Sequence, residues 1–354
     1  MNTRFGWRGP AWGLVLVGLM GSLFFPVDSM AQEETRLSGQ DVAIYNLAGR
    51  VEMVPGGGND VVVQTTRGGR DGQRLELNVI RVDGREALVI RYPDDQVVYP
   101  ELGRGSRTQI RVRSDGTFGE AREGDRVEIR GSGGGMEAWA DLRISIPSGK
   151  DVALYLAVGE TQADGVDSDL LVDTGSGDVF ARRIGGDLSV DTGSGDVTAE
   201  DVQGRLMVDT GSGDVEVSGV VGEEVVLDTG SGDVDVRGVT ASNLEVDTGS
   251  GDVTLIQISV PDIYVDTGSG EVEMDLIQDV DDLVVDTGSG SVTLRVPEGI
   301  GAQVEVDTGS GGIDVDIPLE VREVKRDYLR GVIGDGRGQI RIDTGSGSIR
   351  LLNR

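Results

Sequence analysis

The stretch "LLVDTGSGDV", residues 170–179, contains the motif on which the fold of this chain depends. The letters DTGSG occur nine times, beginning at Asp173, Asp191, Asp209, Asp228, Asp247, Asp266, Asp286, Asp307 and Asp343. One copy alone would match the Asp-Thr-Gly turn of an aspartic protease, where two lobes or subunits each supply one carboxylate to a shared site. A spacing of 18 residues is too short to build a lobe, so the repetition argues against a protease and for a repeated structural unit.

The spacing of the motif and of the apolar residues around it defines this unit. Successive motif aspartates are 18, 18, 19, 19, 19, 20, 21 and 36 residues apart. With the aspartate as position 0, positions −3 and −1 are aliphatic in every copy, and positions +6 and +8 are apolar in every copy. Alternation of this kind predicts a short half-buried strand on each side of a Gly-rich turn. The inward-facing positions are −3 and −1 before the turn but +6 and +8 after it, so the alternation shifts by one residue within the turn. We expect the glycines of GSG to allow this shift.

No unit of this length can bury its apolar face alone, but stacked units about 4.8 Å apart can pair in parallel and bury it together. We therefore predict an all-β fold, a parallel β-helix-like β-solenoid with coils of 18–21 residues in 151–354. Residues 32–150 predict a β-rich N-terminal region that caps or begins the stack, with a loop insertion between Pro93 and Gly135. The segment from Ile146 is expected to form the first, imperfect coil.

Residues 320–335, EVREVKRDYLRGVIGD, interrupt the series of motifs. We expect this segment to form a loop or cap near the C-terminal end, just before the last coil, because solenoids need capped ends to avoid end-to-end stacking. A partner-binding insertion is the alternative.

Residues 1–31 have the pattern of a secretory signal peptide. Arg4 and Arg8 precede the apolar run 13–25, and Ser29 and Ala31 stand at the −3 and −1 positions of a cleavage site. An uncleaved membrane anchor is the alternative, but the run is shorter than the roughly 20 apolar residues that a bilayer requires. We expect an exported protein, periplasmic, secreted or on the cell surface, with no transmembrane segment after cleavage.

The composition excludes several kinds of chemistry. The chain has no histidine and no cysteine, which removes the commonest zinc, copper and iron ligands and the Ser-His-Asp and Cys-His catalytic arrangements. Residues 164–316 contain 35 Asp and Glu against five Arg and no Lys. Nucleic acid is therefore a poor partner, and an envelope or surface protein or glycan of unknown identity is the expected one.

Stacking would align the aspartates into columns of like charge, which calcium could bridge. The candidate cation ladder consists of Asp173, Asp191, Asp209, Asp228, Asp247, Asp266, Asp286 and Asp307 at position 0, with Asp178, Asp196, Asp214, Asp233 and Asp252 at position +5. The known calcium repeat G-G-x-G-x-D-x-U-x differs in both period and Gly-Asp spacing. The favoured interpretation is that the first aspartate caps its turn and the second is solvated surface charge. No metal site is assigned, and calcium is the one cofactor left open.

The segment Ile146–Gly149, Gly159 and the run Thr174–Val179 with its later copies resemble the bacterial putative-adhesin family of unknown function. The resemblance covers roughly residues 40–354 and implies a β-solenoid at the cell envelope without an established catalytic site. We therefore expect a non-catalytic structural, adhesin-like or scaffolding protein. The alternatives are a calcium-dependent binding protein that uses the Asp ladders, and a β-helix polysaccharide-active enzyme. An enzyme site would lie in the N-terminal region near Tyr92, Tyr99 and Trp139, although core or cap roles suit these aromatic residues better.

Overall fold

The computed structural model describes residues 32–119 and 123–354, so the signal-peptide prediction falls outside the described residues. The described residues lie in one compact unit. Apart from the short 3-10 helices η1 (Gly72–Arg74) and η2 (Pro100–Leu102), the regular structure of the described residues is all strand, which confirms the all-β class. No helix in this described part is long and apolar enough to cross a membrane.

Each DTGSG motif joins two strands that belong to two different sheets. The strand before each turn lies in sheet B: β14 (Asp169–Ser176), β16 (Leu188–Thr192), β18 (Leu206–Thr210), β20 (Glu224–Thr229), β22 (Asn243–Thr248), β24 (Asp262–Thr267), β26 (Asp282–Thr287), β28 (Ala302–Thr308) and β32 (Gly338–Thr344). The strand after each turn lies in sheet A: β15 (Val179–Ile184), β17 (Val197–Val202), β19 (Val215–Ser218), β21 (Val234–Arg237), β23 (Val253–Ile258), β25 (Val272–Leu276), β27 (Val292–Val296), β29 (Ile313–Asp316) and β33 (Ile349–Asn353).

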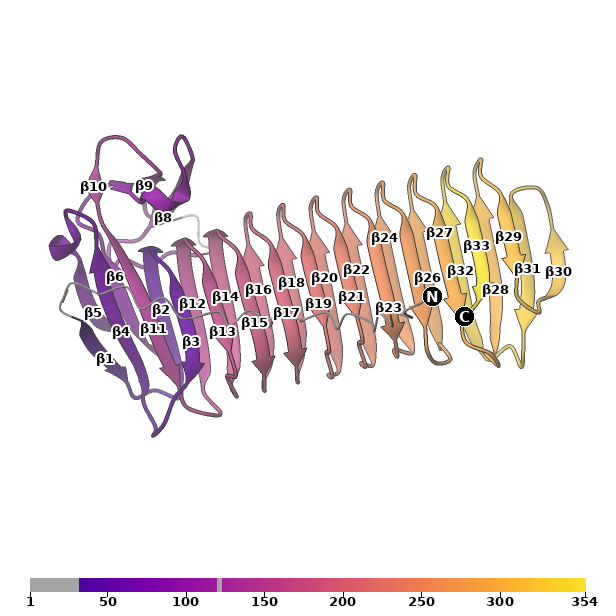
Figure 1. Cartoon of the computed structure of the whole chain (residues 1–354), viewed down its shortest axis with the longest axis horizontal. Coiled ribbons are helices and arrows are strands. Elements are labelled where there is room, and N and C mark those ends of the chain that lie inside the picture. The colour runs from indigo at the N-terminus through magenta and orange to yellow at the C-terminus, as the bar shows by residue number, and fades with distance from the viewer. Residues whose placement is uncertain (1–31, 120–122) are drawn as a thin grey trace, which may run out of the picture. The chain divides into compact units, whose positions relative to one another are not determined.

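Equivalent residues of successive coils pair in parallel, as Val172 with Val190 and Val179 with Val197 show. The two sheets face each other (Figure 1). The aliphatic side chains at positions −3, −1, +6 and +8 fill the space between them. Most of these side chains are almost completely buried. The predicted parallel stack is confirmed, and so are the positions predicted to face the interior. Burial of the aliphatic columns stabilises the stack by about 25 cal/mol for each Å² of apolar surface removed from water.

The last coil does not lie at the end of the stack. Strand β32 pairs with β26 on one side and with β28 on the other, and β33 pairs with β27 and β29. The C-terminal residues thus enter between the coils of Asp286 and Asp307. The order of the coils in the sequence is therefore not their order in space. The interval of 36 residues before Asp343 reflects this return of the chain.

Residues 320–333 form an antiparallel hairpin at the end of sheet B. Strand β31 (Tyr328–Ile333) pairs with β28 and is followed outward by β30 (Glu320–Val324). The segment expected to form a loop or cap is thus a hairpin that follows the coil of Asp307 in space, rather than the last coil of the sequence.

The N-terminal region contains a coil that precedes the segment from Ile146. Strands β2 (Asp41–Ala48) and β3 (Val51–Pro55) pair in register with β12 (Asp151–Val158) and β13 (Thr161–Asp164), the strands of the coil predicted to be first. Residues 41–55 therefore form a coil in front of it. Strand β1 (Glu33–Leu37) lies at the N-terminal edge of sheet A, joined to β3 through β4 (Val61–Gly68) and β11 (Trp139–Ile146), and β6 (Arg85–Arg91) and β5 (Glu76–Val82) extend sheet B.

The insertion predicted between Pro93 and Gly135 contains a small sheet rather than a plain loop. Sheet C consists of β7 (Gln96–Val98), β8 (Arg107–Val112), β9 (Asp125–Arg130) and β10 (Met136–Glu137). Its side chains form a second hydrophobic core against the outer face of β2, β6 and β12.

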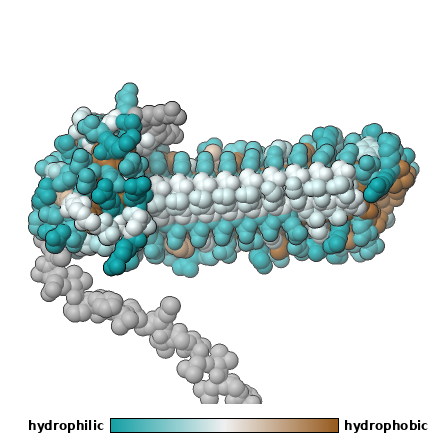
Figure 2. Space-filling model, turned by 90° about the horizontal axis from the view of Figure 1, so that it is seen from above, coloured by the Kyte–Doolittle hydropathy of each residue, from teal (hydrophilic) through white to brown (hydrophobic). Residues whose placement is uncertain are grey.

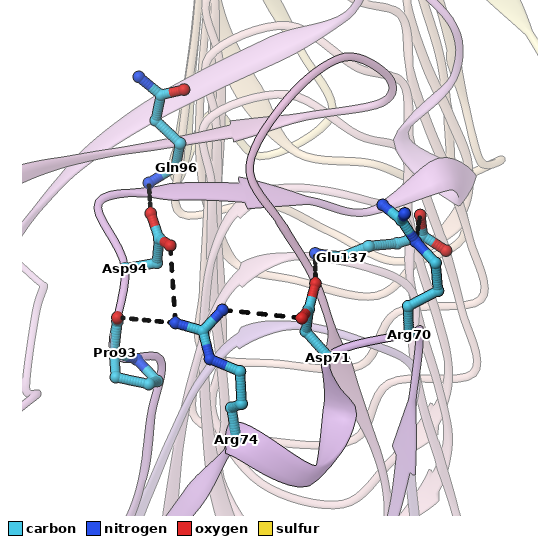
Figure 3. A network of polar contacts seen from close by, with 7 residues as sticks. All are labelled: Arg70, Asp71, Arg74, Pro93, Asp94, Gln96 and Glu137. Atoms are coloured by element: carbon cyan, nitrogen blue, oxygen red, sulfur yellow. Dashed lines mark hydrogen bonds and ion pairs between the residues drawn. The ribbon is translucent and has the colours of Figure 1, made fainter.

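A polar network holds sheet C to the segment that follows β4 (Figure 3). The Arg74 guanidinium lies 3.7 Å from the Asp71 carboxylate and 3.8 Å from the Asp94 carboxylate. Asp71 also accepts the backbone N–H of Glu137 at 3.0 Å, and Arg70 pairs with the Glu137 carboxylate at 2.9 Å. These contacts tie both ends of the insertion to one turn.

Candidate functional site

The aspartates at position 0 form one continuous column on the outer face of sheet B. Each pairs in register with the next coil, and Asp343 takes the place between Asp286 and Asp307. The candidate ladder of eight aspartates therefore has a ninth member. The position-0 side chains are exposed or half-buried, and the column ends at Tyr155 and Tyr45, whose stacked rings lie 4.5 Å apart.

Two members of this column show the effect of their neighbours. Partial burial, followed by the charges of Asp209 and Asp247, raises the pKa of Asp228 above its usual value. Partial burial and the charges of Asp286 and Asp307 likewise raise the pKa of Asp343. These carboxylates ionise less readily than they would in water, because each is partly buried and also stands between two like charges.

Asp228→Asn is expected to raise the melting temperature at neutral pH. An acid whose pKa is raised on folding favours the folded state while it is protonated, and this stability is lost as pH rises from the unfolded pKa through the folded one. The gain from Asp228→Asn should therefore disappear near pH 3. Thermal unfolding from pH 3 to 7 measures it, with Asp235→Asn on the outer face of sheet A as the charge-matched control. Equal rises in melting temperature for both variants at pH 7 would contradict the repulsion between neighbouring aspartates of the column.

The aspartates at position +5 make backbone hydrogen bonds between coils. Asp178, Asp196, Asp214 and Asp233 each accept, through Oδ1, the backbone N–H of the equivalent aspartate one coil further on, at 2.9–3.1 Å. Asp252 accepts the N–H of Glu271 at 2.8 Å. All five side chains are exposed, as the interpretation of surface charge expected, but one oxygen of each carboxylate also satisfies a turn amide of the neighbouring coil.

The threonine at position +1 points inward and is almost completely buried in all nine copies. From Thr210 onward, its hydroxyl donates a hydrogen bond to the carbonyl of the second motif glycine in the neighbouring coil, as Thr248 does to Gly232 at 3.2 Å. The hydroxyls of Thr174 and Thr192 have no hydrogen-bond partner among the described residues. The sequence interpretation assigned turn capping to the first aspartate, and did not identify this ladder of threonines.

Thr248→Val should lower the free energy of unfolding by about 1 kcal/mol, because the half-buried carbonyl of Gly232 loses its donor while the shape of the side chain is kept. Urea denaturation measures this loss. Thr192→Val is the matched control, since its hydroxyl is equally buried without a partner, and it should be neutral or stabilising. Equal losses in both variants would show that the ladder bond contributes nothing.

The N-terminal strands carry a groove of about 500 Å³ on the outer face of sheet A. Arg50, Glu52, Asp141, Arg143 and Glu160 are among its charged residues. Arg143 pairs with Glu52, and the Asp141 carboxylate accepts the backbone N–H of Arg50 at 2.9 Å. Burial raises the pKa of Asp141 above its usual value. The groove is polar and shallow, and its charged groups are largely paired with one another.

The aromatic residues expected near an enzyme site lie in the cap. Tyr99 is buried, and its hydroxyl donates to Glu101 at 2.7 Å. The Tyr92 hydroxyl lies 2.8 Å from Asn46 Oδ1, and the Trp139 ring centroid is 5.9 Å from that of Tyr99. Burial raises the pKa of both tyrosines. These contacts are those of core and cap residues, as the sequence interpretation favoured.

Within the described residues, no group of three or more Asp or Glu is arranged so that it could hold a metal ion. The columns place carboxylates one coil apart in single file, and the +5 column has one oxygen of each carboxylate bonded to an amide. The candidate cation ladder thus stays a prediction, and the solution measurement described below tests it.

The fold and its motifs define the class of the protein, a two-sheet β-solenoid built on stacked Gly-rich turns. The model of the Toastrack DUF4097 family, a domain of unknown function, matches residues 139–352, and the chain belongs to this family. The search of curated proteins found no match. The chain also resembles a crystal structure described as a "putative cell adhesion protein" from Clostridium sporogenes ATCC 15579, at 10% identity over 91% of this chain and 100% of that one. The TM-score of 0.18 is too low for this likeness to support an argument about function.

Proposed function

We propose that the protein is an exported, non-catalytic β-solenoid that acts as a structural, adhesin-like or scaffolding element of a bacterial envelope. The observation that supports this most is that the residues of the motif make contacts between coils. Its threonine and second aspartate bond to neighbouring coils, and its glycines let the coils approach closely. The repeat therefore builds length and a regular surface, on which the position-0 carboxylates form a column suited to a basic partner.

Export is tested by fusing residues 1–31 to alkaline phosphatase, an enzyme active only after it crosses the inner membrane, in a bacterial host. The fusion should be active, and N-terminal sequencing should find cleavage after Ala31. A fusion with the run 13–25 interrupted by two arginines is the control and should be inactive. An inactive native fusion would overturn the exported location.

The surface role is tested with labelled protein and the envelope fraction of the bacterium that produces it. The triple variant Asp209→Asn, Asp228→Asn, Asp247→Asn should bind this fraction at least tenfold more weakly than the unchanged protein. The matched control carries Glu200→Gln, Glu216→Gln and Asp235→Asn, which remove the same charge from the outer face of sheet A. Equal binding by all three proteins would show that the column is not the contact surface.

A calcium titration separates turn chemistry from metal binding. We expect calcium to raise the melting temperature no more than a sodium salt of matched ionic strength, because the two columns offer single-file carboxylates that screening alone relieves. Thermal unfolding with a chelator control measures the difference. A saturable, calcium-specific rise would instead favour the calcium-dependent binding protein.

A further inference from the structure

The two sheets end at different levels at the C-terminal end of the stack. In sheet A the last strand is β29, the partner of β28 in the same coil. Sheet B continues beyond β28 with β31 and β30. The end is therefore a step, in which two strands of sheet B have no strand of sheet A opposite them. Among the described residues, both β29 and β30 have one edge without a neighbouring strand.

The inner face of this step is apolar and open to solvent. Val321 and Val324 pair with Gly331 and Leu329, which lie on the core side of β31. The two valines are nevertheless 51% and 66% exposed. Beside them lie half-buried side chains of β29 and the segment after it, Ile313, Val315, Ile317 and Leu319. Figure 2 shows the resulting hydrophobic surface at this end of the stack, away from the N-terminal sheets.

We propose that this step is the contact surface for a second copy of the same chain, joined tail to tail by a twofold axis parallel to the strands. Such an axis places sheet B of one copy in line with sheet A of the other. Strand β30 of one copy then lies beside the open edge of β29 of the other. Both pairs form at once, because the interface of a twofold dimer uses the same surface on each copy. The two strands missing from sheet A at the step are supplied by the two extra strands of the partner's sheet B.

The direction of the strands fits this arrangement. Strand β30 runs in the direction of β28, opposite to β29, and rotation about an axis parallel to the strands keeps that direction. The new pair is therefore antiparallel and satisfies two open edges. On the outer surface it would bring Asp314 and Asp316 of β29 next to β30, which carries Glu320 and Glu323 as well as Arg322. The match therefore depends on strand direction and on the apolar inner face rather than on charge.

The exposed valines make the proposal testable without disturbing the core. Residues 32–354, which lie within one compact unit, should sediment as a dimer. The double variant Val321→Glu, Val324→Glu should sediment as a monomer while its circular dichroism and melting temperature show that it is still folded. The matched control is Met207→Glu, Val221→Glu, at side chains that are 47% and 58% exposed elsewhere on the stack, and it should remain a dimer.

Cross-linking places the contact, since the chain has no cysteine of its own. Under oxidising conditions Val324→Cys should yield disulfide-linked dimers, because the residues at position 324 of the two copies face each other across the axis. Val221→Cys should not yield them. Three results would overturn the proposal: a monomer at all concentrations, a dimer that survives the Val321→Glu, Val324→Glu change, or growth into larger polymers, which a closed twofold joint forbids.

Discussion

Deletion of residues 338–354 is expected to lower the free energy of unfolding far more than the loss of an ordinary chain end. These 17 residues are β32 and β33 with their turn, and they lie inside the stack. They bury Ile340, Ile342, Ile349 and Leu351, each at most 2% exposed, and this burial alone amounts to about 6 kcal/mol or more. Direct stacking of the Asp307 coil on the Asp286 coil would recover strand pairing but not the lost coil. Urea denaturation of the truncated chain measures the loss.

An internal deletion is the control for this truncation. Removing residues 299–337 takes out the coil of Asp307 and the hairpin and leaves Asp286 and Asp343 18 residues apart, the spacing of the first coils. Strand β32 can then follow β26 directly, so this variant should keep a single cooperative transition although it loses more than twice as many residues. A truncation at 338 that costs less than about 1 kcal/mol, as frayed ends do, would contradict the threaded arrangement.

Gly270→Ala should also be strongly destabilising. A Cβ at Gly270 would lie 1.7 Å from the carbonyl oxygen of Gly251 in the neighbouring coil, and both partners are backbone, so neither can move aside. The two coils would have to separate, breaking the ladder on both sheets. We expect a loss of about 3–5 kcal/mol in urea denaturation, comparable to the most damaging single substitutions.

Gly312→Ala provides the matched comparison. Gly312 follows the turn of the Asp307 coil and has no atom within 4 Å of the position that a Cβ would occupy. Alanine there should be neutral or slightly stabilising, because it reduces the freedom of the unfolded chain. Similar losses at both glycines would mean that close approach of the coils is not the reason for glycine in the motif.

Much of the fold could be predicted because it depends on local periodicity. The alternation around each DTGSG gave the two strands, and the period gave the parallel register. The position of Asp343 could not be predicted, because β32 carries the same motif as every other coil and fits equally well against any of them. The coil at 41–55 did have a signal, since DVAIYNLAG at 41–49 resembles DVALYLAVG at 151–159, but it stands about a hundred residues from the other coils.

The polar roles within the motif were harder to derive. Aspartate and threonine can both bond to turn amides and carbonyls, so composition alone does not say which does so. The answer depends on the offset between coils, which places the Thr248 hydroxyl next to Gly232 and the Asp233 carboxylate next to the N–H of Asp252. The spacing of the motifs predicted which residues would lie in one column. The direction in which each side chain points depends on the geometry of the turn, which the spacing does not determine.

The threading of the C-terminal coil also separates the order in which the chain is made from the order in which its coils lie. Synthesis delivers the coil of Asp307 and the hairpin before the coil that stands between them and Asp286. A simple repeat protein can grow by adding each new unit to the last one. Here residues 338–354 enter between two coils that precede them in the chain, so the interior at this place is complete only after these later residues have been synthesised.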